Sequence, residues 1–308
     1  AKTVAARPQA ALETTAAGWR VRAGNLEFAV NRAHGVIENL TQDGRLLVQR
    51  GPQLAVWRAA TDNDGLKLFD VVNWGGARFL TEALKAGYDR IELADTQAKA
   101  KAGRDGVAIE IISRWLCPGA QRFITHRQGC TVQPDGGLAV TNVFSIDPKL
   151  PELPRLGVSL VLPPALEQLE WFGRGPLENY SDRKRSSMVA RYRSTVTAQY
   201  VPYILPQEHG NKTDVRWLAL HDDAGHGVRF TAQGRLMEAS ASHFTANDLY
   251  AAKHTTDLTP RPEVQVNLDY GQRGLGTASC GPDTLPQYRI QPGKYQLNFT
   301  VWPTGGAS

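Results

Sequence analysis

The chain has 308 residues, of which 42% are hydrophobic and 21% are charged, and its net charge at pH 7 is +5. A chain of this length buries about three quarters of its unfolded surface on folding, so the composition excludes intrinsic disorder and a collagen-like repeat. Basic residues are scattered apart from Arg183-Lys184-Arg185, which argues against a nucleic-acid partner. No apolar run approaches the roughly 20 residues that a membrane span needs, so we expect no membrane partner.

The first 18 residues, AKTVAARPQAALETTAAG, are rich in alanine and lack the apolar core of a secretory signal. We expect residues 1–18 to be a linker or the end of a preceding domain, and residues 19–308 to form one domain. The chain does not begin with Met, so a longer parent polypeptide or a partner chain is expected, and secretion stays open. Three cysteines without CxxC spacing, Cys117, Cys130 and Cys280, favour a cytoplasmic setting and argue against a zinc site.

Alternation of apolar and polar residues, the pattern of a strand with one buried face, recurs along the chain from Trp19 to Trp302. The clearest alternating segments are residues 26–30, 107–111, 138–140, 156–160, 264–268 and 295–301. Dipeptides that favour tight turns lie beside such segments, namely Asp43-Gly44, Asp64-Gly65, Asp105-Gly106, Asp135-Gly136 and Pro292-Gly293. Only residues 79–86 and 246–252 are predicted to be helical. The pattern therefore predicts an all-β fold, one large antiparallel β-sandwich.

Motifs of several common enzyme classes are absent, including GxSxG, the phosphate-binding loop and HExxH. The stretch Gly274-Leu275-Gly276 follows a predicted strand but precedes no amphipathic helix, which argues against a dinucleotide site. His221 and His226 flank a predicted turn, and this favours a surface position over metal binding. We therefore expect neither a metal nor a cofactor in this chain.

Two segments, residues 171–187 and 200–220, are dense in polar residues and flanked by Pro and Gly, which place them on loops. Such residues suit sugars, because hydroxyl groups need donors and acceptors and sugar C–H faces stack on aromatic rings. They equally suit a buried structural ion network, in which Arg216 is expected to have a carboxylate partner. The candidates are Glu178, Asn179, Asp182, Arg183, Gln207, Glu208, Asn211, Asp214, Arg216 and Trp217.

These segments resemble the C-terminal domain of long bacterial β-galactosidases of glycoside hydrolase family 2, which is also the small chain of two-chain enzymes. The resemblance covers residues 19–303 and implies a supersandwich of the galactose-mutarotase-like type. Its motifs are Arg58, Asp62-Asn63-Asp64, Trp171-Phe172-Gly173-Arg174-Gly175-Pro176, Glu178-Asn179-Tyr180, Asp182-Arg183, Tyr200, Pro202-Tyr203, Pro206-Gln207-Glu208, Gly210-Asn211, Asp214, Arg216-Trp217, Gly274-Leu275-Gly276 and Trp302.

In that family two glutamates carry out retaining hydrolysis of β-galactosides, and both lie on a TIM barrel that uses Mg and Na. The resemblance implies that this chain is the non-barrel domain, which braces the barrel, lines the mouth of its active site and supports oligomer assembly. The implied partners are the barrel segment or large chain and the galactoside substrate. Because the β/α alternation of a barrel is absent here, Glu178 and Glu208 are not expected to be catalytic.

The loop after Gly274-Leu275-Gly276 is implied to reach the active-site mouth. Family members carry a Trp there that stacks on the sugar, whereas this chain has Cys280, preceded by Ser279. A thiol offers far less stacking area than an indole, so the outer sugar subsite is expected to bind weakly. The alternative is that Cys280 is a small buried hydrophobic residue that holds the loop.

Two other functions compete with this one. A free-standing carbohydrate-binding module would bind sugar without a barrel. An aldose 1-epimerase would need a His acid and a Glu base, but Glu208 and His209 are adjacent, and neighbours on a strand point to opposite faces. A domain that packs on a barrel is also expected to keep an exposed apolar patch, with Trp57, Trp74 and Phe79 as candidates.

Overall fold

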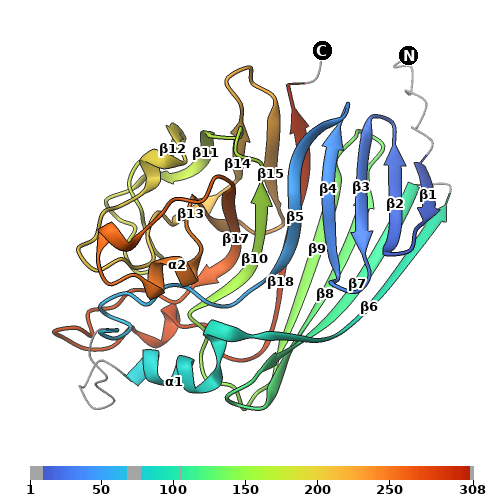
Figure 1. The fold of residues 1–308 in the computed structure, drawn as a ribbon. Coiled ribbons are helices and arrows are strands. Elements are labelled where there is room, and N and C mark those ends of the chain that lie inside the picture. Colours follow the sequence, from blue (N-terminus) through green and yellow to red (C-terminus); the bar gives the residue numbers. More distant parts are fainter. Residues whose placement is uncertain (1–9, 68–77, 104–105, 306–308) are drawn as a thin grey trace.

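The computed structural model describes residues 10–67, 78–103 and 106–305, and its strands form two antiparallel sheets around one core (Figure 1). The first sheet has, in spatial order, β1 (Ala10–Thr14), β2 (Gly18–Ala23), β3 (Leu26–Asn31), β4 (Val36–Gln42), β5 (Arg45–Ala55), β10 (Arg155–Leu162), β17 (Val264–Gln272), β16 (Met237–Ser242) and β13 (Lys212–Val215). The second has β12 (Met188–Thr195), β11 (Gln168–Gly175), β14 (Trp217–His221), β15 (Gly227–Gln233), β18 (Lys294–Thr304), β9 (Leu138–Ile146), β8 (Arg122–Val132), β7 (Gly106–Cys117) and β6 (Glu92–Gly103). The predicted antiparallel β-sandwich is confirmed.

The alternating segments place their apolar residues in the core between the sheets. On β10 the residues Leu156, Val158 and Leu160 are buried, and on β7 Ile109 and Ile111 are buried. Successive side chains of a strand point to opposite faces, so the residues between them project from the outer faces of the sandwich.

The predicted tight turns divide into two kinds. Asp43 and Gly44 join β4 to β5 with φ of 50° and 78°, the backbone that a two-residue hairpin turn requires. Asp64 and Gly65 also lie at a turn, in which their amides donate to the Thr61 carbonyl at 2.9 Å and 3.1 Å, but within the described residues this turn does not join two paired strands. The Asp64 carboxylate in this turn is buried and bound to Arg58.

Helical structure is limited to short pieces. The two expected helices are confirmed as α1 (Arg78–Ala86) and α2 (Ala246–Ala251). Thr245 and Asp248 form a reciprocal capping box at the start of α2, which satisfies backbone donors at this helix end. Single 3₁₀ turns occur at η1 (Tyr88–Arg90), η2 (Thr197–Gln199), η3 (Thr255–Asp257) and η4 (Pro286–Tyr288).

Two details differ from the sequence-based expectations. The sandwich begins before residue 19, because β1 pairs antiparallel with β2 at the edge of the first sheet. Trp57 and Phe79 are buried, at 9% and 6% exposure, so they form no exposed patch, and Trp74 lies outside the described residues. Among the described residues, no helix has the length and apolar character to span a membrane.

Candidate functional site

Loops far apart in the chain gather on one side of the sandwich. They follow β5, β11, η2 and β17, and they cover residues 56–67, 176–187, 200–211 and 273–290. Figure 1 shows the yellow and orange-red loops beside β11, β13 and α2, opposite the edge formed by β1 and β2. Most of the predicted polar candidates lie in this loop cluster.

A buried ion pair holds the first of these loops. Arg58 Nη2 lies 2.8 Å from Asp64 Oδ1, and Arg58 Nε donates to Asp64 Oδ2 at 3.1 Å. Arg58 also donates to the carbonyl oxygen of Arg273 at 2.5 Å, and Asp64 Oδ2 accepts from the Thr61 amide at 3.0 Å. Although burial opposes the charge, the Asp64 carboxylate raises the pKa of Arg58 above its ordinary value. The pair therefore fixes residues 61–64 against the end of β17.

A second buried cation, Arg155, lies between two carboxylates. Its Nε donates to Asp269 Oδ2 at 3.0 Å, and its Nη2 donates to Glu208 Oε1. Gln272 Nε2 donates to the same Glu208 oxygen at 3.2 Å. Burial raises the pKa of Asp269 to about 7 against the opposing effect of Arg155. Glu208 is thus engaged in a structural ion network and is not free to act as an acid or base.

A chain of amide hydrogen bonds continues from this network. Asn211 Nδ2 donates to Glu238 Oε2 at 2.8 Å and to the carbonyl oxygen of Asn179 at 3.0 Å. Asn179 Oδ1 accepts from the Thr213 amide at 2.8 Å. Burial raises the pKa of Glu238 to about 7, while the Asn211 hydrogen bond opposes that shift. The predicted Asn179 and Asn211 are therefore buried positioning groups that join two loops.

The loop that carries Cys280 is held by side chains from two other loops. Asn63 Nδ2 donates to the Gly276 carbonyl at 3.0 Å, and Asn63 Oδ1 accepts from Ser279 Oγ at 2.7 Å. Asp182 accepts from the amides of Leu275 at 3.0 Å and Gly276 at 2.8 Å. Cys280 itself is exposed. The loop is thus bound at its base and presents Ser279 and Cys280 outward.

Three further candidates lie at the same loop cluster. Glu178 accepts from Tyr203 Oη and, at 2.8 Å, from the Gly210 amide. Arg183 Nη2 donates to the Gly276 carbonyl at 2.8 Å, and Gln207 Oε1 accepts from the Asp62 amide at 3.1 Å. These contacts join the loops to one another.

Asp214, Arg216 and Trp217 lie apart from this network. Asp214 binds Arg174 at 2.5 Å and Lys184 at 3.3 Å, and its side chain is 27% exposed. Arg216 donates to the backbone oxygen of Asp214 at 2.6 Å and lies over the Phe172 ring. The prediction that Arg216 has a carboxylate partner is wrong for the described part of the chain, where its side chain contacts a carbonyl oxygen and an aromatic ring. Trp217 lies on β14, directly opposite Phe172 on β11.

Several residues of the network were not among the predicted candidates. Arg155 and Asp269 belong to alternating strands, where a polar residue between buried ones is read as solvent-facing. The sequence feature that could have identified Arg155 and Asp269 is their charge, because charged residues are unusual in strands that are otherwise apolar. Arg58, Asn63 and Asp64 were present in the motifs of the resemblance.

The adjacent Glu208 and His209 do not share a hydrogen-bond partner. His209 Nδ1 contacts the Gln207 carbonyl at 3.0 Å, whereas Glu208 binds Arg155, so these neighbours engage different partners. Within the described ranges, no group of three or more His, Cys, Asp or Glu side chains could hold a metal ion.

Comparison with solved structures finds distant likenesses over most of the chain. A galactose mutarotase-like protein from Lactobacillus casei aligns with 95% of this chain and 100% of its own, at 11% identity and a TM-score of 0.49. Galactose 1-epimerase from Lactobacillus acidophilus aligns with 97% of this chain and 99% of its own, at 8% identity and a TM-score of 0.49.

Sequence comparison is more specific. The β-galactosidase of Lactobacillus delbrueckii subsp. bulgaricus is 30% identical over 290 residues, which cover 92% of this chain and 27% of that protein. The β-galactosidase of Priestia megaterium is 28% identical over 303 residues, covering 97% of this chain and 28% of that protein. The chain thus spans little more than a quarter of the curated relatives it matches. A family model described as the β-galactosidase small chain matches residues 22–301, and the chain therefore belongs to this family.

Proposed function

We propose that this chain is the non-catalytic domain of a β-galactosidase and acts on terminal β-galactosides only together with a segment that carries the catalytic glutamates. The observation that carries the proposal is the small-chain family match over residues 22–301. The site chemistry agrees with it, because Glu178 and Glu208 are both taken up by hydrogen bonds that hold loops. Retaining glycoside hydrolysis needs two carboxyl groups across one bound sugar, and neither glutamate is free for this work.

Exposed apolar side chains support a contact with the catalytic segment. Ile204 is 92% exposed, Leu177 75% and Met188 71%. Leu177 and Ile204 flank the hydrogen bond between Glu178 and Tyr203, and Met188 pairs with Gly175, two residues before Leu177. Apolar side chains gathered on one surface of a soluble domain are typical of an interface. We call Leu177, Met188 and Ile204 the apolar patch.

The Cys280 loop supports a role at the mouth of the active site. Asn63 and Asp182 bind its backbone, so the loop has a defined shape although Cys280 and Ser279 are exposed. A thiol in this position offers little surface for stacking on the leaving sugar. We therefore expect the assembled enzyme to bind the leaving sugar weakly, whereas its binding of the galactosyl group should be little changed.

The apolar patch can be tested by association. The catalytic segment of a β-galactosidase that lacks this domain would be mixed with this chain, and complex formation followed by analytical ultracentrifugation. Ile204→Asp combined with Leu177→Asp should weaken association at least tenfold, because each change buries a charge in an apolar contact. Leu236→Asp is the matched control, since Leu236 is 39% exposed and lies between β15 and β16.

Unchanged association of the double variant would show that the apolar patch is not the interface. Equal weakening by Leu236→Asp would show that added negative charge, and not its position, causes the effect. Near-ultraviolet circular dichroism of each variant would confirm that the sandwich is intact.

A further inference from the structure

One ammonium group of the loop cluster lies among four backbone carbonyl oxygens. Lys67 is half-buried in the segment that follows β5, and Figure 1 shows this blue segment passing below α2. Its Nζ lies within hydrogen-bond distance of the carbonyl oxygens of Pro206 at 2.7 Å, Leu249 at 2.6 Å, Tyr250 at 3.0 Å and Ala252 at 2.7 Å. One side chain therefore holds together the loop after β5, the loop of residues 200–211 and the end of α2.

These contacts have the form of ion coordination. A lysine ammonium carries three N–H groups and has four acceptors here, so at least two of the carbonyl oxygens share one donor. Carbonyl oxygens that converge on one positive charge are the means by which proteins replace the water around a potassium ion. Ammonium and potassium ions have nearly the same size, and the oxygen distances of 2.6–3.0 Å suit both. The ring of Tyr250, 5.6 Å from Nζ, adds a further attraction for a cation.

The charge of Lys67 is balanced by dipoles and not by an ion pair. Asp62 is the carboxylate whose charge favours the ammonium, but among the described contacts the two groups form no ion pair. Burial lowers the pKa of Lys67 to about 8 against this effect of Asp62. Leu249, Tyr250 and Ala252 end α2, where backbone carbonyl groups lack intrahelical donors and favour a positive charge. The arrangement is thus a set of neutral oxygens around one cation.

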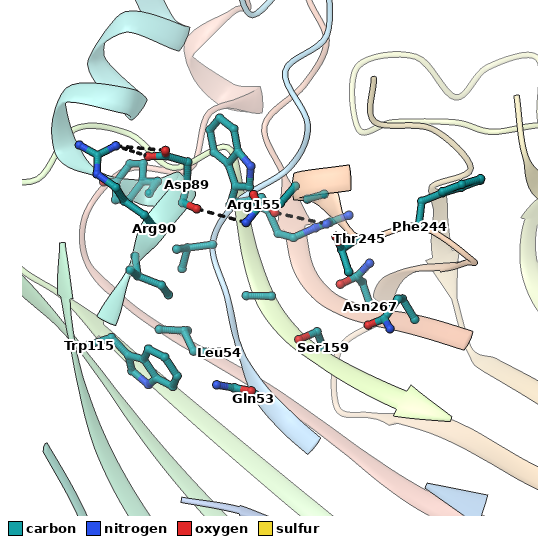
Figure 2. Close-up of a pocket in the computed structure, with 18 residues that line it drawn as sticks. Gln53, Leu54, Asp89, Arg90, Trp115, Arg155, Ser159, Phe244, Thr245 and Asn267 are labelled. Carbon is teal, nitrogen blue, oxygen red and sulfur yellow. Dashed lines mark hydrogen bonds and ion pairs between the residues drawn. The ribbon is translucent and has the colours of Figure 1, made fainter. Parts of the chain in front are cut away.

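These oxygens are separate from a cavity of about 360 Å³ that lies beside β5, β10 and β17 (Figure 2). Thr245 and Asn247, at the first turn of α2, line that cavity, whereas the oxygens around Lys67 belong to the end of the helix. Figure 2 shows Thr245 above Asn267 of β17. A molecule in the cavity would therefore not occupy the position of the ammonium.

We propose that the four carbonyl oxygens form a site for a monovalent cation of the size of potassium, and that the Lys67 ammonium fills this site as a cation tethered to the chain. Tethering gives the ammonium a high effective concentration at the oxygens, so the parent chain needs no free ion there. A shorter side chain would leave the oxygens without a positive charge and would open the site to a dissolved cation. The inference holds whether or not this chain assembles with a catalytic segment.

The test compares the Tm of Lys67→Ala in potassium chloride and in choline chloride at equal ionic strength, since choline is too large for the site. The variant should be less stable than the parent in choline, and potassium at roughly ten times its dissociation constant should raise the Tm of the variant by about 3–5 °C. Propylammonium chloride should stabilise the variant as well, because it supplies the atoms that the substitution removes. Rubidium soaked into crystals of the variant should be found by anomalous scattering where Nζ lies in the parent.

Two controls separate this site from general effects of salt. Lys67→Met fills the site with an uncharged side chain of similar length, so potassium should raise its Tm no more than that of the parent. Lys85→Ala removes an exposed lysine, whose side chain is 65% exposed, and should also respond to potassium as the parent does. If Lys67→Ala is unfolded in choline, recovery of its circular dichroism on addition of potassium or propylammonium replaces the comparison of Tm.

The proposal is overturned if Lys67→Ala responds to potassium and propylammonium no more than the parent does, or if it stays unfolded in every salt. It is also overturned if Lys67→Met gains as much from potassium as Lys67→Ala, because the ion would then act elsewhere on the chain.

Discussion

Replacement of Asp64 by Asn should destabilise this chain more than any single change at its exposed ion pairs. The substitution keeps the shape of the side chain and removes its charge. Arg58 is fully buried, and Asp64 is its carboxylate partner at 2.8 Å and 3.1 Å. The variant would therefore leave a buried guanidinium with neutral acceptors alone, namely the amide oxygen of the substituted side chain, the Arg273 carbonyl and the Gln272 amide oxygen.

The expected loss follows from the burial of the pair. Removing one partner of a buried ion pair typically costs about 3–5 kcal/mol, because the other charge remains uncompensated. A free-energy loss of 1 kcal/mol lowers Tm by about 2–4 °C in domains of 150–250 residues, so a loss of about 3–5 kcal/mol should lower Tm by roughly 6–20 °C. An exposed pair contributes at most about 1 kcal/mol. Glu110→Gln, which breaks the exposed pair with Arg127, should therefore change Tm by only a few degrees.

Differential scanning calorimetry of five proteins tests this reasoning: the parent, Asp64→Asn, Arg58→Met, the double variant and the control Glu110→Gln. The double variant should be more stable than the sum of the two single losses predicts, because it buries no unpaired charge. A Tm of Asp64→Asn within the change seen for Glu110→Gln would refute the argument. Strict additivity of the two single changes would also refute it, because it would show that the two side chains do not interact.

Three further outcomes follow from the site. Cys280 should react with a thiol reagent faster than Cys117 or Cys130, because Cys280 is exposed and burial raises the pKa of the other two thiols to about 12. Slower labelling of Cys280 than of the other two would contradict its proposed position at the active-site mouth. Burial raises the pKa of Glu238 from 4.5 to about 7, so the folded state holds its proton more tightly, and that stabilisation is lost as pH rises through 7. The parent should therefore lose more stability than Glu238→Gln between about pH 5 and about pH 8, and equal pH profiles would contradict the assignment. Arg216→Ala should change Tm only slightly, since Arg216 contacts a carbonyl and a ring, and a large drop would reveal a missing partner.

The strand pattern was predictable because each strand has one face on the core. The alternation of residues 156–160 and 264–268 identifies β10 and β17 directly. The short helices at residues 79–86 and 246–252 were also predictable, because their pattern likewise lies in the local sequence. Pro and Gly also located the polar loops at strand ends.

The buried charges were not predictable, because they depend on contacts between distant segments. Arg155 and Asp269 occupy outward positions of their strands, and the period-2 pattern reads such positions as exposed. The loops cover this face: Glu208 reaches Arg155, and its amide donates to the Ala59 carbonyl at 3.1 Å. Trp57 was misjudged for the same reason, since its ring packs edge-on against Tyr250 across the fold.

Hydrolysis of a chromogenic β-galactoside tests the central claim most directly. This chain would be assayed alone and in mixtures with the β-galactosidase catalytic segment from the same organism, across a range of molar ratios. The account predicts no turnover by the chain alone, and activity that rises with added chain to a plateau at equimolar ratio. Turnover by the chain alone that disappears in Glu208→Ala, or a catalytic segment that binds the chain yet gains no activity, would contradict the account.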